Sequence, residues 1–490
     1  MKAAHVIGAG VAGLASAIRL ALKGYQVTVF ENNAYPGGKL STFSSGEYRF
    51  DAGPSLFTMP HFVDALFELA GEDPRAYYSY KKKAIACRYF WEDGTQFNAY
   101  GDREAYLEEV ERVFSGHANA VDRYLTKAKK KYDLLAKLFL ERSLHQWSTL
   151  FNTDTLKALS QLHRYELASS LHGVNQRQLK APHLVQLFDR YATYNGSNPF
   201  QTPGLMTLVQ HLESHYGTFI PKGGMVQITN ALYALAKKKG VHFKFEHKVS
   251  EICVKNKKAT GVVANGTRYP ADVVISNMDV TPTYKKLLPQ QKPPRKLKKM
   301  QPSSSAVIFY WGMNKSFPQL ELHNILFSKD YKKEFNAIFN AQTLDDDPTV
   351  YINITAKDVP QDAPKGGENW FVMVNAPYDT GQNWEQLTQK LRKETLAKIA
   401  RIFGEDITPH IATEVVRTPL EIEQLTQSYK GALYGSSSNR RADAFLRHPN
   451  FSKTIEGLYF CGGSVHPGGG IPLCLLSAKI TTSLLPDEPT

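Results

Sequence analysis

The first thirty residues contain three glycines at the spacing G-x-G-x-x-G, directly after an apolar run. They are Gly8, Gly10 and Gly13 in "AAHVIGAGVAGLASAIRLALKGYQVTVFE". The pattern predicts a strand, a tight glycine turn that includes Ala12, a helix, and a second strand that ends at Glu31. Such a turn brings backbone N–H groups close to a pyrophosphate, and an acid at the end of the second strand accepts hydrogen bonds from ribose hydroxyls. The sequence therefore predicts a βαβ unit that binds an adenine dinucleotide.

The residues after this unit favour FAD over NAD. A second diglycine, Gly37-Gly38, is followed by Lys39 in "ENNAYPGGKLSTF". This arrangement is similar to that of flavoproteins that bind FAD in an extended form. It supplies a second stretch of bare backbone and a cation for the pyrophosphate or ribityl region. In the next segment, "FDAGPSLFTMP", we expect Ser55 and Leu56 to meet the flavin end of the cofactor.

A third glycine-rich stretch, "LYFCGGSVHPGGGIPLCLLSAK", lies near the end of the chain. Pro472 suits the first turn of a helix, so the segment predicts a strand, a glycine turn and a helix. The free N–H groups at the start of a helix attract negative charge. We expect Gly463, Gly470 and Ile471 to contact the cofactor. Residues 468–471 would then face the N1–C2=O edge of the isoalloxazine ring, which becomes anionic when flavin accepts a hydride.

The middle of the chain predicts further parts of the same cofactor domain. The apolar run Val273–Ser276 is expected as a buried strand beside the first one, with Val249 against the adenine and Asn277 near the phosphates. Residues from about 75 to 220 show long, basic, amphipathic patterns that predict helices. From about 300 to 445, strands and helices alternate, and "SSAVIFYWGMN" and "ENWFVMVNAP" are the clearest strands.

These patterns predict an α/β fold in which two domains interleave along the chain. A Rossmann-like FAD-binding domain would comprise residues 1–75, 220–300 and 446–490. An α+β domain that binds substrate and faces a membrane would comprise residues 76–219 and 301–445. This arrangement resembles that of the two-dinucleotide-binding flavoproteins, which include amine oxidases.

Charge and composition limit the partners and the location of the protein. The formal net charge is +13, with lysine clusters at 81–83, 127–131 and 293–299. Solvated helix faces explain such clusters, and so does attraction to anionic lipid. The segment 120–147 mixes lysines with Leu, Phe and Trp, which favours an interfacial helix, with a solvated helix as the alternative. No motif for nucleic acid, no metal spacing, no signal peptide and no transmembrane run is found. We expect a bacterial, cytoplasmic protein at the membrane periphery.

The terminal motifs resemble those of the bacterial-type phytoene and carotenoid desaturases over essentially the whole chain. Val465 departs from that pattern, because the family commonly has a small hydroxylated residue there. The segments "LVQLFDRYATYNGSNPFQTPGL" and "YKGALYGSSSNRRADAFLRHPN" are most similar to 1-hydroxycarotenoid 3,4-desaturases. This resemblance implies an FAD enzyme that forms a C3–C4 double bond in a 1-hydroxylated acyclic carotenoid, by hydride transfer to flavin N5.

Several alternatives to this function remain open. A phytoene or diapophytoene desaturase would carry the same cofactor motifs. A flavin amine oxidase shares the fold but should have a different C-terminal motif. A non-catalytic isoprenoid-binding chaperone would be expected to lose some flavin contacts, whereas Glu31 and the glycine turns are present here. The acceptor that reoxidises the cofactor, oxygen or a quinone, is not predicted by any motif.

Individual polar residues have both functional and structural interpretations. His466 is a conceivable base, but a histidine in a turn more often fixes that turn by hydrogen bonding. Cys461 and Cys474 could link flavin covalently, although buried apolar thiols are the more common case. We expect non-covalent FAD and identify no catalytic residue.

Two polar segments are candidates for contact with the substrate. His323, with Glu321 and Asp330 nearby, could line a substrate channel or form a surface hairpin. A second group could bind the substrate hydroxyl or simply pair with neighbouring helices, and it comprises Arg190, Tyr191 and Asn195.

Overall fold

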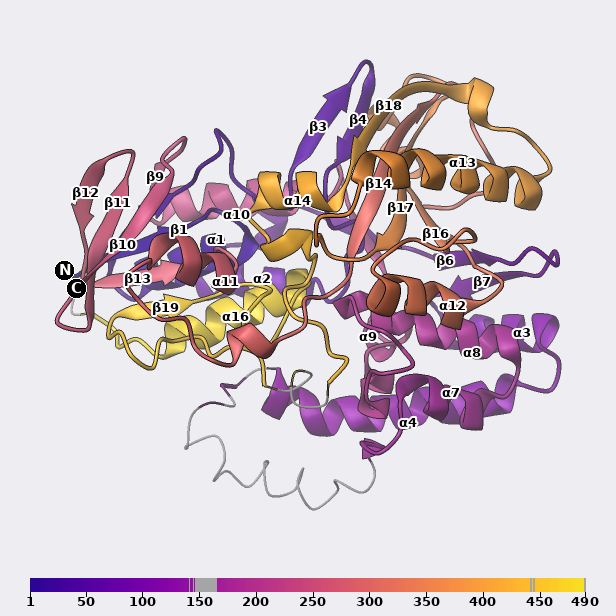
Figure 1. Cartoon of the computed structure of the whole chain (residues 1–490), viewed down its shortest axis with the longest axis horizontal. Coiled ribbons are helices and arrows are strands. Elements are labelled where there is room, and N and C mark those ends of the chain that lie inside the picture. The colour runs from indigo at the N-terminus through magenta and orange to yellow at the C-terminus, as the bar shows by residue number, and fades with distance from the viewer. Residues whose placement is uncertain (141, 144, 146–164, 441–442, 444–445, 489–490) are drawn as a thin grey trace.

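A parallel sheet of five strands forms one half of the molecule (Figure 1). The computed structural model describes all residues except 141, 144, 146–164, 441–442, 444–445 and 489–490. The strand order is β19-β13-β1-β2-β9, and every neighbouring pair is parallel. The strands are β1 (Ala3–Ile7), β2 (Gln26–Phe30), β9 (His242–Lys244), β13 (Val273–Ser276) and β19 (Leu458–Phe460). The prediction that Val273–Ser276 lies beside the first strand is confirmed.

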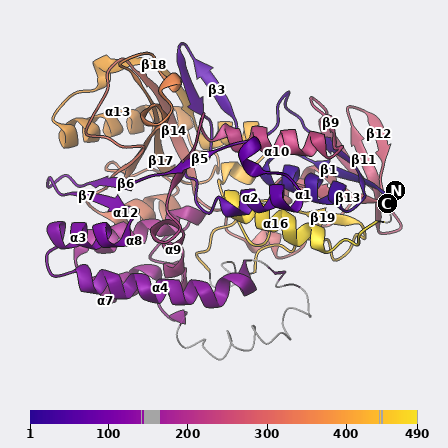
Figure 2. The ribbon, with the colours of Figure 1, turned by 180° about the vertical axis from the view of Figure 1, so that it is seen from behind.

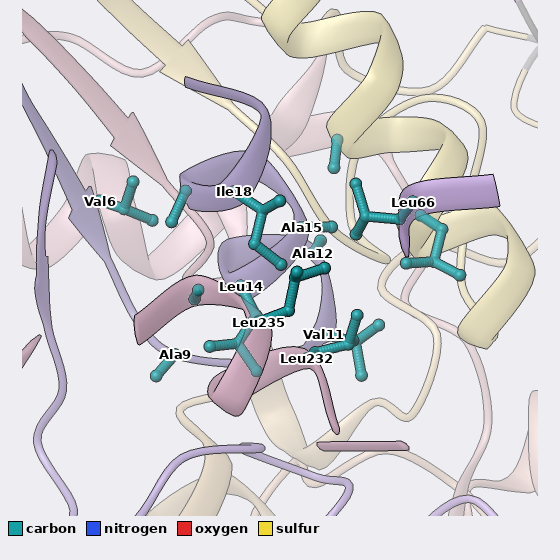
Figure 3. Close-up of a cluster of buried hydrophobic side chains, with 14 of the residues drawn as sticks. Val6, Ala9, Val11, Ala12, Leu14, Ala15, Ile18, Leu66, Leu232 and Leu235 are labelled. Atoms are coloured by element: carbon teal, nitrogen blue, oxygen red, sulfur yellow. The ribbon is translucent and has the colours of Figure 1, made fainter. Parts of the chain in front are cut away.

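Four helices contribute to the apolar core of this half, and Figure 3 shows the centre of that core. Leu14 and Ile18 of α1 are fully buried, as are Leu232 and Leu235 of α10. Burial of such side chains contributes roughly 1.5–3 kcal/mol each. The small alanine side chains along α1 allow the neighbouring elements of the core to pack close to this helix. The helices are α1 (Val11–Leu22), α2 (His61–Leu69), α10 (Val226–Lys238) and α16 (Ile471–Ser483).

Three small antiparallel sheets accompany the two large ones in the part of the chain that the structure describes. One has three strands and lies at the end of the molecule where both termini are found (Figure 1). There Lys2 Nζ lies 2.9 Å from Glu488 Oε1. Its strands are β10 (Val249–Lys255), β11 (Lys258–Ala264) and β12 (Thr267–Pro270). Two further pairs are formed by β3 (Thr42–Ser45) with β4 (Tyr48–Asp51), and by β5 (Tyr80–Lys82) with β8 (Phe219–Pro221).

A mixed sheet of seven strands forms the other half, in the order β18-β14-β17-β16-β15-β6-β7. Only the pair β15·β6 is parallel. One face packs on α13 (Trp384–Phe403), where Phe309, Trp311 and Val372 meet Leu396 and Ile399. The strands are β6 (Ile85–Phe90), β7 (Gln96–Tyr100), β14 (Ser305–Met313), β15 (His323–Leu326), β16 (Val350–Ile354), β17 (Glu368–Ala376) and β18 (Ile411–Arg417). The two strands expected after residue 300 are β14 and β17.

The expectation of helices from about residue 75 onward is wrong for its first part. Residues 80–100 form strands β5, β6 and β7, and helices begin only at Arg103. Tertiary pairing decides this, because β6 joins β15 from the far part of the chain. A local signal existed in the Asp93-Gly94 turn between two runs that are rich in aromatic residues.

The helices that follow form a layer below the seven-stranded sheet, visible from both sides in Figures 1 and 2. They are α3 (Arg103–Val113), α4 (Ala118–Phe139), α7 (Leu171–Leu179), α8 (Pro182–Asp189) and α9 (His211–Ser214). Further short helices are α11 (Val280–Pro282), α12 (Tyr331–Asn336) and α14 (Pro419–Thr426).

The predicted interfacial segment 120–147 is only partly described. Within α4, Tyr124 and Leu125 are buried in the helical layer, while Lys127 and Lys130 are exposed. The alternative interpretation of a solvated helix predicts this distribution. Residues 141, 144 and 146–147 of the segment lie outside the described residues.

Candidate functional site

One continuous cavity of about 980 Å³ runs between the two large sheets. It reaches from the glycine turn after β1 to the helical layer under the seven-stranded sheet, so residues from almost every part of the chain line it. Of the predicted cofactor residues, thirteen contribute to its wall: Gly8, Gly10, Ala12, Glu31, Gly38, Lys39, Ser55, Leu56, Val249, Asn277, Gly463, Gly470 and Ile471. Gly13 lies behind the wall.

The turn after β1 is tight because its glycines touch backbone and amide atoms. A Cβ atom on Gly13 would lie 2.1 Å from the carbonyl oxygen of Gly8. A Cβ on Gly10 would lie 2.7 Å from Asn277 Oδ1. The first contact is with backbone that cannot move aside, so only glycine fits at position 13, whereas a Cβ at position 10 would force the Asn277 side chain to shift. The result is bare backbone at the cavity wall directly before α1.

Glu31 is held in place by main-chain donors at the end of β2. Its Oε2 accepts a hydrogen bond from Ala9 N at 2.8 Å, and its Oε1 accepts one from Asn33 N at 2.9 Å. The residue is buried and lines the cavity. Each carboxylate oxygen has room for a second hydrogen bond. A diol at this end of the cavity could donate to both oxygens.

The C-terminal glycine turn leads into α16 as predicted. Gly470 is the residue before the helix, with φ +104°, and a Cβ atom there would meet nothing within 4 Å. Gly470 and Ile471 both line the cavity at the start of α16. Pro472 lies in the first turn of α16. Backbone N–H groups in a first turn have no acceptor within the helix, so the N–H that proline lacks breaks no helical hydrogen bond.

Two cations stand at this part of the cavity, a half-buried lysine and a buried arginine. Lys39 Nζ donates to the carbonyl oxygen of Leu433 at 2.9 Å, and burial lowers the pKa of the Lys39 ammonium. Arg447 was missed by sequence reasoning, because no local motif marks it. Its Nη1 donates to the carbonyl oxygens of Tyr434 at 2.8 Å and Gly463 at 3.2 Å. Burial lowers the pKa of Arg447 to about 10, which leaves it charged at neutral pH.

His466 and the two nearby cysteines have structural surroundings. His466 Nε2 lies 2.8 Å from the carbonyl oxygen of Arg142, and burial lowers the pKa of its ring to about 4. A neutral ring that donates to a carbonyl fixes the turn, which is the structural interpretation of this residue. Burial also raises the pKa of the Cys461 thiol to about 12 and that of Cys474 to about 11. Both therefore remain protonated, although Cys474 lines the cavity.

The deep part of the cavity is walled by one face of the seven-stranded sheet. Side chains alternate between the two faces of a strand, so every second residue points the same way. In β14, β15 and β17 the cavity residues follow this alternation: Ile308, Tyr310, His323, Ile325, Phe371, Met373 and Asn375. Tyr351 of β16 and Arg417 of β18 also line the cavity, and β6 adds two consecutive residues, Ala86 and Cys87. The opposite wall is also largely apolar and comes from the helical layer: Leu135, Leu205, Met206, Leu208 and Leu212. This chamber suits a long hydrocarbon.

A buried ion pair lies at the wall of this apolar chamber. Arg190 Nη2 lies 3.3 Å from both carboxylate oxygens of Glu213, and the Tyr191 hydroxyl donates to Glu213 at 2.9 Å. Tyr194 donates to the same carboxylate. Burial opposes ionisation of Glu213, but Arg190 and these hydroxyls outweigh burial and hold the pKa of the carboxyl below its usual value. Arg190, Glu213 and Tyr194 line the cavity, whereas Tyr191 stands behind them.

Asn195 faces the cavity beside this pair. Its Nδ2 donates to Ser438 Oγ at 3.0 Å, while its Oδ1 is buried without a partner among the described residues. Sequence reasoning identified Arg190 and Asn195 but missed Glu213. Glu213 belongs to a four-residue helix, and only the fold brings it to Arg190.

The segment around His323 is not a surface hairpin. His323 begins β15, an internal strand between β16 and β6, and only 2% of the residue is exposed. The structure therefore supports the channel interpretation for His323. Glu321 lies 3.5 Å from Arg88, and Asp330 is an exposed residue that caps α12 through Lys333 N. Neither of these two acids lines the cavity.

The fold and the glycine-built cavity are those of a flavoprotein, and comparison with known families agrees. The model of the flavin containing amine oxidoreductases matches residues 11–484, so the chain belongs to this family. The protein is thus a flavin-dependent oxidoreductase, and the expected flavin cofactor, FAD, is confirmed by the family. The predicted amine-oxidase-like fold is also confirmed.

Individual relatives refine this picture. The chain is 54% identical over 99% of both sequences to a 1-hydroxycarotenoid 3,4-desaturase from Flavobacterium sp. (strain P99-3). It is 35% identical to a 4,4'-diapolycopene oxygenase from Methylomonas sp., over 97% of this chain and 96% of the relative. An oxidoreductase from Methanosarcina mazei has the same fold, with a TM-score of 0.65 and 17% identity over 98% of this chain and 100% of that one. The predicted resemblance to carotenoid desaturases is confirmed.

The residues present fit FAD. The pocket walls are bare at Gly10 and Gly470, where a nucleotide cofactor needs backbone contact, and Glu31 offers free lone pairs to a ribose. When bound, the flavin supplies a two-electron acceptor for hydride. No group of metal-ligating side chains occurs among the described residues. Within the same part of the chain, every helix is too short or too polar to span a bilayer.

Proposed function

We propose that this protein is an FAD-dependent carotenoid desaturase that forms a C3–C4 double bond in a 1-hydroxylated acyclic carotenoid. The observation that carries the proposal is the cavity itself. It joins a dinucleotide-type glycine turn to a long apolar chamber, and a few buried polar groups line that chamber. The 54% identical relative, which is a 1-hydroxycarotenoid 3,4-desaturase, supports the same activity.

The polar groups in the chamber support a hydroxylated substrate over a pure hydrocarbon. A hydrocarbon offers no hydrogen bond, so each polar atom that it covers loses water without compensation. Asn195 Oδ1 already lacks a protein partner among the described residues. A substrate hydroxyl could donate to such an acceptor. A site built in this way discriminates strongly against an analogue that lacks the hydroxyl.

A flavin amine oxidase is the second candidate, because the family model carries that name. An ammonium substrate would need an unpaired carboxylate or an aromatic cage in the cavity. Glu213 is a carboxylate in the cavity wall, but Arg190 already neutralises it. The apolar chamber therefore favours the carotenoid. A phytoene desaturase or a carotenoid oxygenase remains the nearer competitor.

We also propose which residues and segments serve this function. The thirteen cofactor residues at the cavity wall would bind FAD, with Gly13 as the contact between α1 and the turn. The domain that binds FAD would comprise residues 1–75, 220–300 and 446–490, and the substrate domain residues 76–219 and 301–445. Strands β1, β2, β9, β13 and β19 all come from the first set.

Peripheral contact with an anionic membrane is part of the proposal, because a carotenoid dissolves in lipid rather than in water. The mouth of the cavity at α14 supports it. Leu425 lines the cavity and is 55% exposed, and Leu420 on the same helix is 43% exposed. Lys286, at the same mouth, adds positive charge. Flotation with anionic liposomes at low and high salt tests this contact, and absence of binding at low salt would refute it.

Product analysis tests the central proposal. The enzyme should be expressed in a bacterial host that makes one defined carotenoid, either with or without the C1 hydroxyl. We expect a new C3–C4 double bond mainly in the hydroxylated carotenoid. Equal conversion of phytoene would show that the subfamily assignment is wrong. An oxygenated product in place of a desaturated one would favour the oxygenase alternative.

A further inference from the structure

Arg447 is a buried cation that the proposed function leaves without a role. It lies between α14 and β19, and only 3% of the residue is exposed. Among the residues that the structure describes, no carboxylate forms a direct ion pair with it, and Asp443 acts on its charge only from farther away. A buried charge without a close counter-ion is unfavourable, because it loses water without compensation. Such a residue in a cavity wall therefore indicates a negatively charged ligand.

One edge of the Arg447 guanidinium is open to the cavity. Its Nη1 is already used by the carbonyl oxygens of Tyr434 and Gly463. Nε and Nη2 donate to no described residue, yet neither atom is sealed in the protein interior. Since Arg447 lines the cavity, the open edge lies at the cavity wall. The N–H groups of Nε and Nη2 point the same way, so this edge can bind two neighbouring acceptors together.

The C-terminal glycine turn fixes the position of this guanidinium. A Cβ atom on Gly468 would lie 3.1 Å from Nε and 3.4 Å from Cζ of Arg447, so the arginine packs against bare backbone there. Burial raises the pKa of the Cys474 thiol to about 11, and the charges of Lys39 and Arg447 act against this effect. Cys474 N donates to the carbonyl oxygen of Gly470 in the first turn of α16. The cation and the N-terminal end of α16 therefore stand at the same part of the cavity, where both favour negative charge.

The N1–C2=O edge of a flavin offers the matching pair of neighbouring acceptors. A hydride carries two electrons and one proton, so its transfer to N5 leaves one added negative charge, which lies at this edge. A fixed cation at the edge therefore stabilises the reduced cofactor more than the oxidised one. The pyrophosphate, in contrast, has the same charge in both oxidation states, and the glycines assigned to it lie at the turn after β1.

We propose that Arg447 binds the N1–C2=O edge of FAD through Nε and Nη2 and thereby raises the reduction potential of the cofactor. This inference rests on the proposed set of cofactor residues at the cavity wall, and it adds a residue that no motif marks. Arg447 is a cofactor-binding residue in this scheme. It neither takes nor gives a proton, because arginine stays protonated in proteins.

The two-electron midpoint potential of the FAD-containing protein tests the proposal without any carotenoid. It is measured at pH 7 by equilibration with a reference dye during slow reduction. Arg447→Met removes the charge and keeps an unbranched side chain. We expect its potential to be lower than that of wild type by about 30 mV or more, which corresponds to a tenfold or greater loss of preference for the reduced cofactor. Arg447→Lys keeps the charge and should retain part of the difference.

Arg440→Met is the matched control. Arg440 is exposed, does not line the cavity and donates to the carbonyl oxygen of Lys299 at 3.0 Å. Its charge acts on Asp443, as that of Arg447 does. A lower potential in Arg447→Met but not in Arg440→Met supports a direct contact with the flavin. The FAD content of each variant reports whether the fold is intact, and Arg447→Lys serves where the methionine variant fails to retain FAD.

A second measurement needs only the wild-type protein. The dependence of the potential on pH counts the protons that are taken up with the two electrons. One proton, which leaves the reduced flavin anionic, gives about 30 mV per pH unit. We expect this slope at mildly acidic pH, where reduced FAD free in solution is neutral. A slope twice as steep would mean that the bound reduced flavin is neutral as well, and it would refute the proposal.

Other results would also overturn the inference. An unchanged potential in Arg447→Met excludes a contact with the flavin edge. Weaker FAD binding at an unchanged potential, measured by equilibrium dialysis, would place Arg447 at the pyrophosphate instead. If the potential shifts as expected but no carotenoid is desaturated, the proposed function is wrong while the role of Arg447 stands. Desaturation together with an unshifted potential would leave the proposed function intact and remove this role.

Discussion

Replacement of Glu213 by glutamine should strongly destabilise the protein, because it leaves a buried cation without its counter-ion. The Glu213 side chain is 4% exposed and that of Arg190 is 9% exposed. Arg190 also lies over the ring of Tyr191, 4.5 Å from its centroid. Arginine is not deprotonated in proteins, so the charge stays when the carboxylate is removed. Breaking one side of such a pair costs about 3–5 kcal/mol.

The double variant Arg190→Met/Glu213→Leu separates the charge effect from packing. It removes both charges and keeps much of the side-chain volume, and such replacements are often nearly neutral. We expect the double variant to be more stable than Glu213→Gln alone. The comparison therefore measures the cost of an uncompensated buried charge, and not the total contribution of the ion pair to the free energy of unfolding.

Urea unfolding at pH 7, followed by both far-UV circular dichroism and flavin release, is a suitable assay. Two probes are needed because a chain of this size need not unfold in one step. An apparent loss below about 1 kcal/mol for Glu213→Gln would refute the argument, since a surface-like pair contributes only that much. The pKa of Glu213 is held low in the folded protein, so its stabilising effect is complete above the ordinary glutamate pKa of about 4.3 and is lost as the pH falls through the lower folded value.

Three further predictions concern the cofactor site and the response to pH. Glu31→Ala should weaken FAD binding roughly 5- to 150-fold, because about 1–3 kcal/mol of charge-assisted hydrogen bonds is lost. Equilibrium dialysis measures the affinity for FAD, and an unchanged affinity would mean that the carboxylate does not contact the cofactor. Gly13→Ala places its Cβ 2.1 Å from Gly8 O and should abolish FAD retention, whereas normal flavin absorbance of the purified variant would contradict the geometry of this turn. His323 and His466 have folded pKa values of about 4, below the ordinary 6.5, so unfolding takes up protons between these values and stability should fall as the pH is lowered from 6.5 to 4. Midpoints of urea unfolding that stay constant across this range would refute the buried, neutral state of both rings.

The cofactor half of the protein could be predicted from sequence because its signals are local. Gly13 packs against the carbonyl oxygen of Gly8, a few residues before it, and Glu31 follows at a distance set by one helix and one strand. The glycine turn before Pro472 is local in the same sense. Each of these motifs specifies its own backbone shape. Even so, Arg447, a buried cation at the cavity, carries no motif and was not predicted.

The substrate half depends on contacts between distant parts of the chain, and here sequence reasoning was weaker. Residues 80–100 form strands because β6 pairs with β15, whose residues lie more than 200 positions away in the sequence. His323 is ambiguous in sequence, since a polar residue before an apolar run fits a surface hairpin equally well. Its position inside the sheet makes it a buried residue at the cavity wall, and its Nε2 has no hydrogen-bond partner among the described residues.

The sequence by itself determined the class of fold, the cofactor and the family resemblance, because short-range motifs and their spacing are enough to specify a dinucleotide turn. Only the tertiary structure decided which polar groups share the chamber with the substrate. Arg190 and Asn195 lie on one short helix, yet their environments come from Glu213 and Ser438, which belong to other parts of the chain. Burial and pairing of a polar atom depend on what packs against it in space, and no local pattern encodes that.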